Sequence, residues 1–497
     1  MSNRPETNKQ SCPVYKKCGG CQLQNLSYTE QLEFKQRKVE KLLKRFCTVE
    51  KIIGMKTPYH YRNKVQAAFY TDKKGKIISG VYQSGSHHVV GIDSCQTEDV
   101  IADKIIVAVR KLLPSFRMTT YNEDTGKGFL RHILVKRGFA TNQIMLVLVT
   151  GTPVFPSKNN FVKAILKQFP KITTIVQNIN PYRTNLVLGD NQKVLYGKGY
   201  IEDILCGCRF RISPKSFYQI NPAQTEVLYG KAIEFANLKG NETVLDTYCG
   251  IGTIGIIAAK NGAGNVIGAE LNGDAVRDAI VNARANNLKN IRFYKADAGE
   301  FMREAANEDE KPDVVFMDPP RAGSDRKFLE SLIKMSPKKV VYVSCNPETL
   351  ARDLAYLTQN SPYKAQKIQP VDMFPHTAHV ETVVLLSRKK PDGHINVKVE
   401  FGEGEGKVPL DNIAKRAEEY KPKERVTYKM IKEYIEAKYS FKVHTAYIAE
   451  VKRDLGLPMY DAPNAVEELK QPRKHPTAEK VEAIKDALRY FEIMEEI

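Results

Sequence analysis

Residues 216–390 alternate short apolar runs with helical stretches, and this alternation constrains the fold more than any other feature of the chain. The apolar runs are TVLDTYC, NVIGAE, IRFYKAD, DVVFMD, KVVYVSC and HVETVVLLS. Such alternation is typical of a parallel, doubly wound sheet. We therefore predict an α/β domain over residues 216–390, with its ligands at the carboxyl ends of the strands.

The residues before this domain have a different pattern. Basic loops alternate with β-like runs such as HILVKR and QIMLVLVT, and Gly and Pro punctuate them. This pattern predicts largely antiparallel β structure with some helix. We expect a first segment over residues 1–98 and a central β-rich domain over residues 99–215.

The residues after 390 predict a helical accessory domain over 391–497. In VTYKMIKEYIEAKY, helical spacing puts Ile431 and Ile435 on one face, and TAYIAEVKRDLGLP repeats the pattern with Ile448 and Val451. This domain also holds basic clusters, KPKER and KQPRKH. It is either an RNA anchor or a module for stability or partner binding.

A formal net charge of +19 indicates a polyanionic partner, most simply nucleic acid. The alternative is a solvated basic surface. No stretch approaches the roughly 20 apolar residues of a membrane helix, and the polar start, MSNRPETNKQ, lacks the apolar core of a signal peptide. We expect a cytoplasmic protein that binds RNA as a monomer and has no membrane partner.

Three of the nine cysteines are clustered near the amino terminus. Cys12, Cys18 and Cys21 have the spacing C-x5-C-x2-C, and Cys95 lies far downstream in GIDSCQTED. In a reducing compartment, clustered thiols indicate metal binding rather than disulfides. Four cysteines suit zinc or an iron–sulfur cluster, and the spacing alone does not choose between them.

The segment VLDTYCGIGTIGI carries Gly250, Gly252 and Gly255 between a strand and a helix. Glycines at such a turn let backbone N–H groups approach a ligand, although the motif also occurs in turns without one. Glu270 ends the next strand, at the spacing where an acid meets ribose hydroxyls, and Asp297 ends the third. The ligand is either a dinucleotide or S-adenosylmethionine.

Two further strands end in residues that suit chemistry. DVVFMD runs into Asp318 and two prolines, which predicts a rigid wall presenting a carboxylate, or else a helix cap. KVVYVS ends in Cys345, followed by the turn Asn346-Pro347. From the residues alone, Cys345 is equally a nucleophile and a core thiol.

Several motifs together resemble the RNA uracil-5-methyltransferase family, whose members use S-adenosylmethionine on ribosomal or transfer RNA. The motifs lie between residues 12 and about 388, in the family's order: C-x5-C-x2-C, SFYQINPAQTEVLY, DTYCGIGTIG, MDPPRAG, SCNPETLARDL and DMFPHTAHVETVVLL. The resemblance implies a Rossmann-like class I methyltransferase domain, a β-rich amino-terminal and central region that binds RNA, and a helical carboxyl-terminal extension.

The four cysteines look like the ribosomal branch of this family, which carries a [4Fe–4S] cluster. The resemblance implies that Cys345 is the nucleophile and Glu381 the general base. The residues that it places against cofactor or target base are Gln219, Tyr248, Thr253, Glu270, Asp297 and Asp318. The residues that it implies as cluster ligands are Cys12, Cys18, Cys21 and Cys95. Some members have Asn in place of Thr253.

The implied chemistry explains why these residue types are needed. Uracil C5 is a poor nucleophile, and a thiolate added at C6 makes it an enolate carbon that can attack a methyl group. Positive charge near Cys345 would lower its pKa, and Arg321 and Arg352 are near it in sequence. Phe217 or Tyr218 would stack on a target base that has left its own stack.

The sequence thus predicts methylation of a uridine in 23S rRNA to 5-methyluridine, as one step of rRNA processing. Three alternatives remain: transfer RNA as the substrate, a non-catalytic iron–sulfur RNA-binding protein on the same fold, and nicotinamide oxidoreduction. The cluster is expected to be structural, because the methylation has no redox step. Basic runs in the first segment, such as KQRKVEKLLKR, would contact RNA phosphates.

Overall fold

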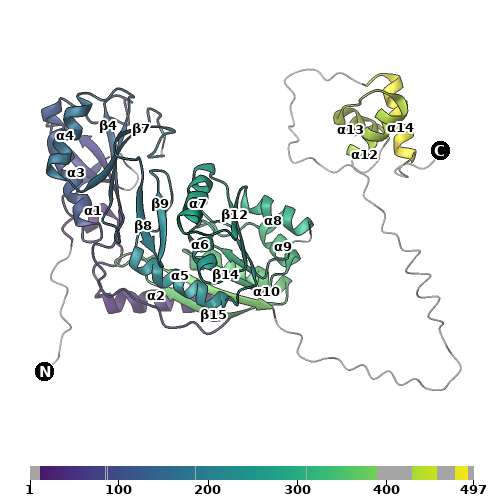
Figure 1. Cartoon of the computed structure of the whole chain (residues 1–497), viewed down its shortest axis with the longest axis horizontal. Helices are drawn as coiled ribbons and strands as arrows, with labels where there is room; N and C mark the ends of the chain where they lie inside the picture. The colour runs from purple at the N-terminus through teal and green to yellow at the C-terminus, as the bar shows by residue number, and fades with distance from the viewer. Residues whose placement is uncertain are drawn as a thin grey trace. The chain divides into compact units, whose positions relative to one another are not determined.

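The computed structural model describes residues 12–83, 86, 88–184, 186–308, 311–388, 428–455 and 476–490. They belong to two compact units, the first within residues 1–394 and the second within 395–497 (Figure 1). The first unit thus contains the regions predicted as 1–98, 99–215 and 216–390, and the division among these three stays a prediction. No helix in the described ranges is long and apolar enough to cross a membrane.

The central region of the first unit is built on a seven-stranded sheet in the order β3-β2-β1-β4-β5-β6-β7. Its pairs are antiparallel except β5 and β6, which are parallel and are joined through α4. The strands are β1 (Lys64–Thr71), β2 (Ile77–Tyr82), β3 (Val89–Gly91), β4 (Leu130–Arg137), β5 (Ile144–Thr150), β6 (Ile172–Ile179) and β7 (Asn191–Tyr196). The helices are α3 (Val100–Leu112), η1 (Pro114–Phe116) and α4 (Lys158–Gln168), and α3 and α4 pack on one face of the sheet.

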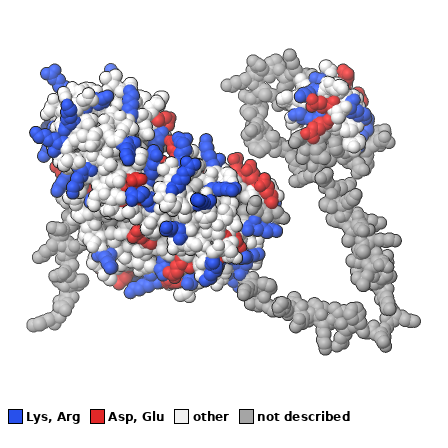
Figure 2. All heavy atoms as spheres, viewed as in Figure 1, with Lys and Arg blue, Asp and Glu red and all other residues white. Residues whose placement is uncertain are grey.

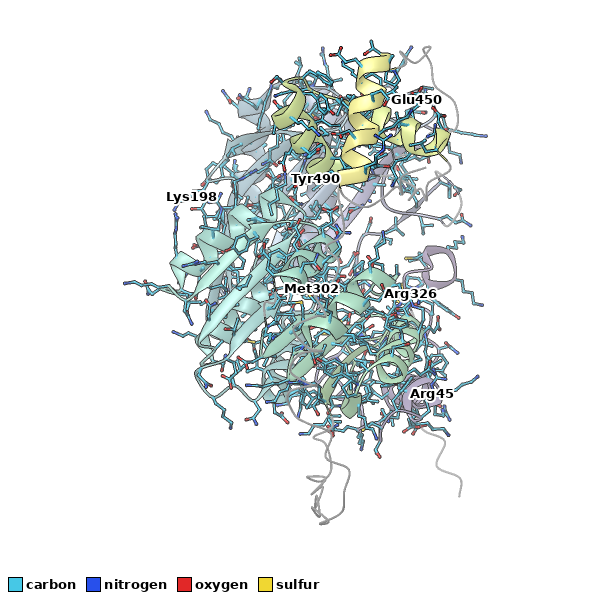
Figure 3. All side chains as sticks on the ribbon, turned by 90° about the vertical axis from the view of Figure 1, so that its right-hand side faces the viewer. Arg45, Lys198, Met302, Arg326, Glu450 and Tyr490 are labelled. Carbon is cyan, nitrogen blue, oxygen red and sulfur yellow. The ribbon has the colours of Figure 1, made fainter. Side chains whose placement is uncertain are left out.

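A hairpin and a helix connect this sheet to the next. The hairpin is β8 (Ile201–Leu205) and β9 (Cys208–Ile212), and the helix is α5 (Pro222–Ala236). The hairpin turns at Cys206 and Gly207, both with positive φ, and its inward side chains share one core with α5 and both large sheets. Lys198, in the turn between β7 and β8, projects away from the ribbon (Figure 3).

The predicted α/β domain is a second seven-stranded sheet in the order β12-β11-β10-β13-β14-β16-β15. The five strands from β12 to β14 are parallel, whereas β16 runs antiparallel between β14 and β15. The strands are β10 (Thr243–Asp246), β11 (Asn265–Glu270), β12 (Ile291–Lys295), β13 (Val314–Met317), β14 (Lys339–Ser344), β15 (Tyr363–Val371) and β16 (Glu381–Arg388). The helices are α6 (Thr253–Lys260), α7 (Gly273–Ala285), α8 (Ala298–Asn307), α9 (Arg326–Met335) and α10 (Pro347–Asn360).

Side-chain caps fix where several of these helices begin. Asn272, Asp297, Asp325 and Asn346 each accept a hydrogen bond from a backbone N–H in the first turn of α7, α8, α9 and α10 respectively. The central strands β13 and β14, with the sequences VVFM and KVVYVS, are almost wholly apolar and buried, as expected of strands covered on both faces. The predicted fold class is thereby confirmed.

The second unit contains the predicted helical pattern. Its described helices are α12 (Tyr428–Tyr439), α13 (Thr445–Asp454) and α14 (Ala478–Tyr490). The expected apolar faces meet in a small core, which holds Ile431, Ile435, Ile448 and Val451 together with residues of α14. Asp486 on α14 accepts hydrogen bonds from Tyr434 and Lys438 on α12.

The amino-terminal segment, with α1 (Tyr15–Cys18) and α2 (Tyr28–Leu43), packs against the α/β domain. A buried ion pair joins them: Lys35 Nζ lies 2.6 Å from Asp372 Oδ1, and both side chains are inaccessible to solvent. Lys35 also donates to the carbonyl of Phe374, and the Tyr28 hydroxyl donates to Asp372 Oδ2. The network ties α2 to the loop between β15 and β16.

We predict that Lys35→Met lowers the free energy of unfolding of the first unit by about 3–5 kcal/mol, because Asp372 is left as a buried, unpaired charge. Urea unfolding measures the change. Lys38→Met is the matched control on the same helix. Its partner Glu348 is 3.6 Å away and both side chains are partly exposed, so a loss of at most about 1 kcal/mol is expected. Equal losses for the two variants would contradict the assigned role of the buried pair.

Candidate active site

A cavity of about 470 Å³ opens at the carboxyl ends of the parallel strands. It is bounded by the loops after β10, β13 and β14, by the start of β16, and by residues of two loops outside the parallel strands, 213–221 and 372–380. Seven of the residues predicted for the site line it: Gln219, Tyr248, Thr253, Glu270, Asp318, Cys345 and Glu381. The topology therefore brings together residues that are more than 160 positions apart in the sequence.

Strand pairing explains why Cys345 and Glu381 meet. In the antiparallel pair β14 and β16, Ser344 lies opposite Thr382. Cys345 is the residue after Ser344 and Glu381 is the residue before Thr382, so they occupy the next opposed position at the cavity end of the two strands. Residues opposed in this way have Cβ atoms about 4.5–5.5 Å apart. The register thus places a thiol and a carboxyl group side by side in the lining of the cavity.

The glycine loop and Glu270 form the other end of the cavity. Gly250 and Gly252 have φ values of 55° and 82°, a region that favours glycine. Glu270 accepts hydrogen bonds from the N–H groups of Gly250 and Asn272, at 3.0 and 2.7 Å. Beneath the loop, buried Asp246 accepts a hydrogen bond from Gly255 N–H at 2.8 Å. This arrangement presents a carboxylate and a close backbone to a ligand with ribose hydroxyls.

The part of the cavity that contains Cys345 also contains two buried carboxyl groups, those of Asp318 and Glu381. Burial raises the pKa of Asp318 to about 7. Burial, with a smaller effect of Asp318, raises the pKa of Glu381 well above its ordinary value. Burial, Glu381 and Asp318 together raise the pKa of Cys345 to about 11. Without ligands, the Cys345 thiol therefore keeps its proton near neutral pH.

Of the two arginines near Cys345 in sequence, Arg321 is the one whose charge lowers the pKa of the thiol. Arg321 lines the cavity, and its charge opposes the rise in pKa of both Cys345 and Glu381. Arg352 instead donates to the carbonyls of Ala322 and Ser324 and pairs with buried Asp353, which fixes the shape of the loop after Asp318. A cationic ligand in the cavity would add to the effect of Arg321.

The structure also decides among neighbouring aromatic and histidine candidates. Phe217 and Tyr218 both line the cavity, but Phe217 is 61% exposed and Tyr218 only 6%, so Phe217 offers the larger free surface to a base. His379 lines the cavity. His376 does not: its ring lies within hydrogen-bonding distance of the Pro58 carbonyl and of Gln31, on the side of the amino-terminal segment.

Tyr229 is a cavity residue that the sequence analysis missed. It is fully buried on α5, and its hydroxyl forms hydrogen bonds with the side chains of Thr253 and Gln219. It thereby links the glycine loop to the loop that carries Phe217. Nothing in a single apolar helix face distinguishes it from the core tyrosines beside it.

Asp297 takes a different position from the other predicted residues. It caps α8, where its carboxylate accepts hydrogen bonds from Gly299 and Glu300 N–H. It is not among the residues that line the cavity. Its contact with a cofactor stays a prediction.

The predicted cluster cysteines lie close together. The charges of Cys95, Cys18 and Cys12 act on Cys21, whose pKa burial and these neighbours raise to about 12. A hydrogen bond of 3.2 Å from Gln24 to Gln96 joins the two segments that carry the thiols. Within the described ranges, however, no group of three or more His, Cys, Asp or Glu is placed to hold a metal ion. The structure thus does not confirm the predicted metal site.

The surface of the first unit carries much of the positive charge. On the face drawn in Figure 2, Lys and Arg side chains are spread widely, and Asp and Glu form smaller patches. Such a distribution suits a polyanion.

A glycine loop, a ribose-type acid and a strand-end thiol on a doubly wound sheet define a nucleotide-dependent transferase of the methyltransferase type. Residues 27–389 match the model of the tRNA (uracil-5-)-methyltransferase family. The chain therefore belongs to this family, and its predicted class, an S-adenosylmethionine-dependent RNA methyltransferase, is confirmed.

Individual relatives agree with this assignment. An uncharacterized RNA methyltransferase of Bacillus cereus is 44% identical over 389 residues, which cover 77% of this chain and 84% of the relative. One from Listeria monocytogenes is 46% identical over 379 residues, covering 76% and 83%. The crystal structure of Pyrococcus abyssi tRNA (uracil-54, C5)-methyltransferase with S-adenosyl-L-homocysteine has a TM-score of 0.63 and 30% identity, covering 76% of this chain and 87% of that one.

Proposed function

We propose that the protein transfers a methyl group from S-adenosylmethionine to C5 of a uridine in 23S rRNA, in the cytoplasm and as a monomer. The observation that carries the proposal is the opposed position of Cys345 and Glu381 in a cavity that also holds the glycine loop. C5 methylation of uracil requires a thiol nucleophile that adds to C6 and a carboxylate base that removes the proton from C5, the neighbouring atom.

The roles of the residues follow from the chemistry. S-adenosylmethionine would supply the methyl group and a sulfonium charge, and the cavity residues Gly250, Glu270 and Tyr248 would hold it. Cys345 would lose its proton to solvent and its sulfur would bond to uracil C6, which moves the electron pair of the C5–C6 double bond toward C5. C5 would then take the methyl group as the S–CH3 bond breaks, and S-adenosyl-L-homocysteine would leave. Glu381 as carboxylate would remove the C5 proton, the C5–C6 double bond would re-form and the thiolate would leave.

Recognition of uracil is assigned to Gln219 and Asp318. Asp318 is buried, and its raised pKa of about 7 leaves it either as a donor or as an acceptor near neutral pH. Hydrogen bonds from these two groups to O4 and N3 would discriminate against cytosine, because the mismatched base leaves buried polar groups unpaired. Phe217 is placed to stack on the extruded base.

We expect the protein to transfer labelled methyl groups to 23S rRNA that lacks 5-methyluridine, and not to unmodified tRNA. Scintillation counting of each purified RNA gives the rates, and mapping of 5-methyluridine gives the position. Faster transfer to tRNA would replace rRNA by tRNA as the substrate. Binding of both RNAs without transfer to either would favour the non-catalytic alternative.

Cys345→Ala is expected to abolish methyl transfer, because no other thiol is opposed to Glu381. Glu381→Gln should instead accumulate a covalent protein–RNA adduct, since methylation proceeds but the C5 proton stays. Denaturing gels with labelled RNA reveal the adduct. Cys47→Ala, whose thiol donates to the Gln366 carbonyl outside the cavity, should retain wild-type turnover. Turnover by Cys345→Ala would exclude this mechanism.

We also propose that Cys12, Cys18, Cys21 and Cys95 hold a [4Fe–4S] cluster. Their proximity supports the fit, and a cluster needs its thiolates farther apart than a single ion does. Its role would be structural: Leu23 N–H donates to the His376 carbonyl, and Gln22 accepts a hydrogen bond from Ala378 N–H. The cysteine segment thus supports the loop that brings His379 to the cavity.

Anaerobically purified protein should be brown, with absorbance at roughly 400 nm from iron–thiolate charge transfer. Cys21→Ser should lose the colour and the bound iron, and Cys206→Ser, a thiol in the β8–β9 turn, should keep both. If the wild-type protein is colourless and contains zinc, the four cysteines form a zinc site and the proposed cluster is wrong.

A further inference from the structure

A second cavity of about 470 Å³ lies between the start of β7, the end of β9 and α7. It has the same volume as the catalytic cavity, so it has room for a nucleoside. The loop of residues 213–219 separates the two: Ser216 lines the second cavity, and Phe217, the next residue, lines the catalytic one. Consecutive Cα atoms are about 3.8 Å apart. A group bound in the second cavity would therefore be a near neighbour of the target base.

The wall between the cavities is held from both sides. Lys136 Nζ, fully buried on β4, donates to the carbonyls of Ser213 and Ser216, both at 2.8 Å. From the other side, Ser216 Oγ donates to Asp278 on α7 at 2.6 Å. Because the loop is fixed by these bonds, the second cavity is a formed feature of the fold.

The lining has balanced charge, which indicates the kind of ligand. Each basic side chain in it has an acidic neighbour: Lys215 with Asp190, Arg277 with Asp274, and Arg211 with Asp278. A phosphate needs uncompensated positive charge, and every positive charge of this lining is paired with a carboxylate. Alternating donors and acceptors instead suit a neutral group that offers both, as the edge of a nucleobase does.

Arg211 adds a flat surface to this lining. Its guanidinium lies 4.0 Å from the ring centroid of Tyr200. Arg211 lines the cavity and Tyr200 does not, so the Arg211 side chain borders both the tyrosine ring and the cavity. RNA-binding proteins stack unpaired bases on guanidinium planes of this kind.

We propose that the second cavity binds an unpaired nucleobase of the substrate RNA, adjacent in the strand to the methylated uridine, stacked on Arg211. The inference rests on the proposed RNA substrate. It adds a specificity site, because a polar pocket that hydrogen-bonds one base rejects the bases that leave its groups unpaired. Phe217 would then lie between two extruded bases, one in each cavity.

Val281→Trp tests the proposal by filling the cavity without removing a hydrogen bond, since Val281 lines it from an exposed position on α7. The matched control is Ala285→Trp, one helical turn farther along and outside both linings. A 23S rRNA transcript is the probe. Val281→Trp should reduce RNA affinity and kcat/KM at least tenfold, and Ala285→Trp should match the wild type. Both should bind S-adenosyl-L-homocysteine normally, which reports intact folding.

Arg211→Lys separates stacking from charge, because lysine keeps the charge and loses the plane. We expect the same loss of RNA affinity. Each nucleotide beside the target is replaced in turn by an abasic site. One of these replacements should weaken RNA binding by the wild type, and the same replacement should leave RNA binding by Val281→Trp unchanged. Wild-type affinity in Val281→Trp would overturn the proposal, and so would an absence of any abasic effect. RNA binding is measured without turnover, so these outcomes are distinct from a failure of methyl transfer.

Discussion

The site depends on one constraint, the antiparallel insertion of β16 between β14 and β15. A purely parallel sheet would present only strand ends at its carboxyl edge. Here β16 begins at that edge, so the first residue of one strand faces the residue after the last of its neighbour. Cys345 and Glu381 meet through this reversal, and the backbone ladder below them fixes their separation better than a loop would.

Burial changes the pKa values of the same residues. Burial raises the pKa of Asp318, Glu381 and Cys345; Asp318 adds to the rise at Glu381, and Glu381 and Asp318 add to the rise at Cys345. Arg321 offsets the rise at Glu381 and Cys345 only in part. A cationic ligand beside Arg321 would lower the pKa of the thiol further, so the thiolate would form chiefly when such a ligand is bound. A nucleophile that stays protonated until then is protected from unproductive chemistry.

The sheet, the glycine loop and the strand-end acids Glu270 and Asp318 could be predicted from the sequence. Hydrophobic periodicity and the positions of Gly and Pro are local properties of the chain, and they mark where strands and turns lie. The sequence also placed Ile431 and Ile435 correctly on an apolar helix face. The sequence did not predict that Tyr229 lines the cavity, or that Arg321 and Arg352 make different contacts. Their roles depend on which distant loop packs against them, and no local pattern encodes that. The cysteines show the same limit, since their spacing indicated a site but not its ligand.

The ties between α2 and the loop after β15 have a consequence for how the protein is made. Lys35 and Asp372 are 337 residues apart in the chain. During synthesis, Lys35 on the amino-terminal helix therefore cannot pair with Asp372 until most of the chain has left the ribosome. Contacts of such long sequence separation close late and slowly. A chain that ends before residue 372 lacks Asp372, so it cannot anchor to α2 the loop that carries Phe374 and His379 of the cavity lining.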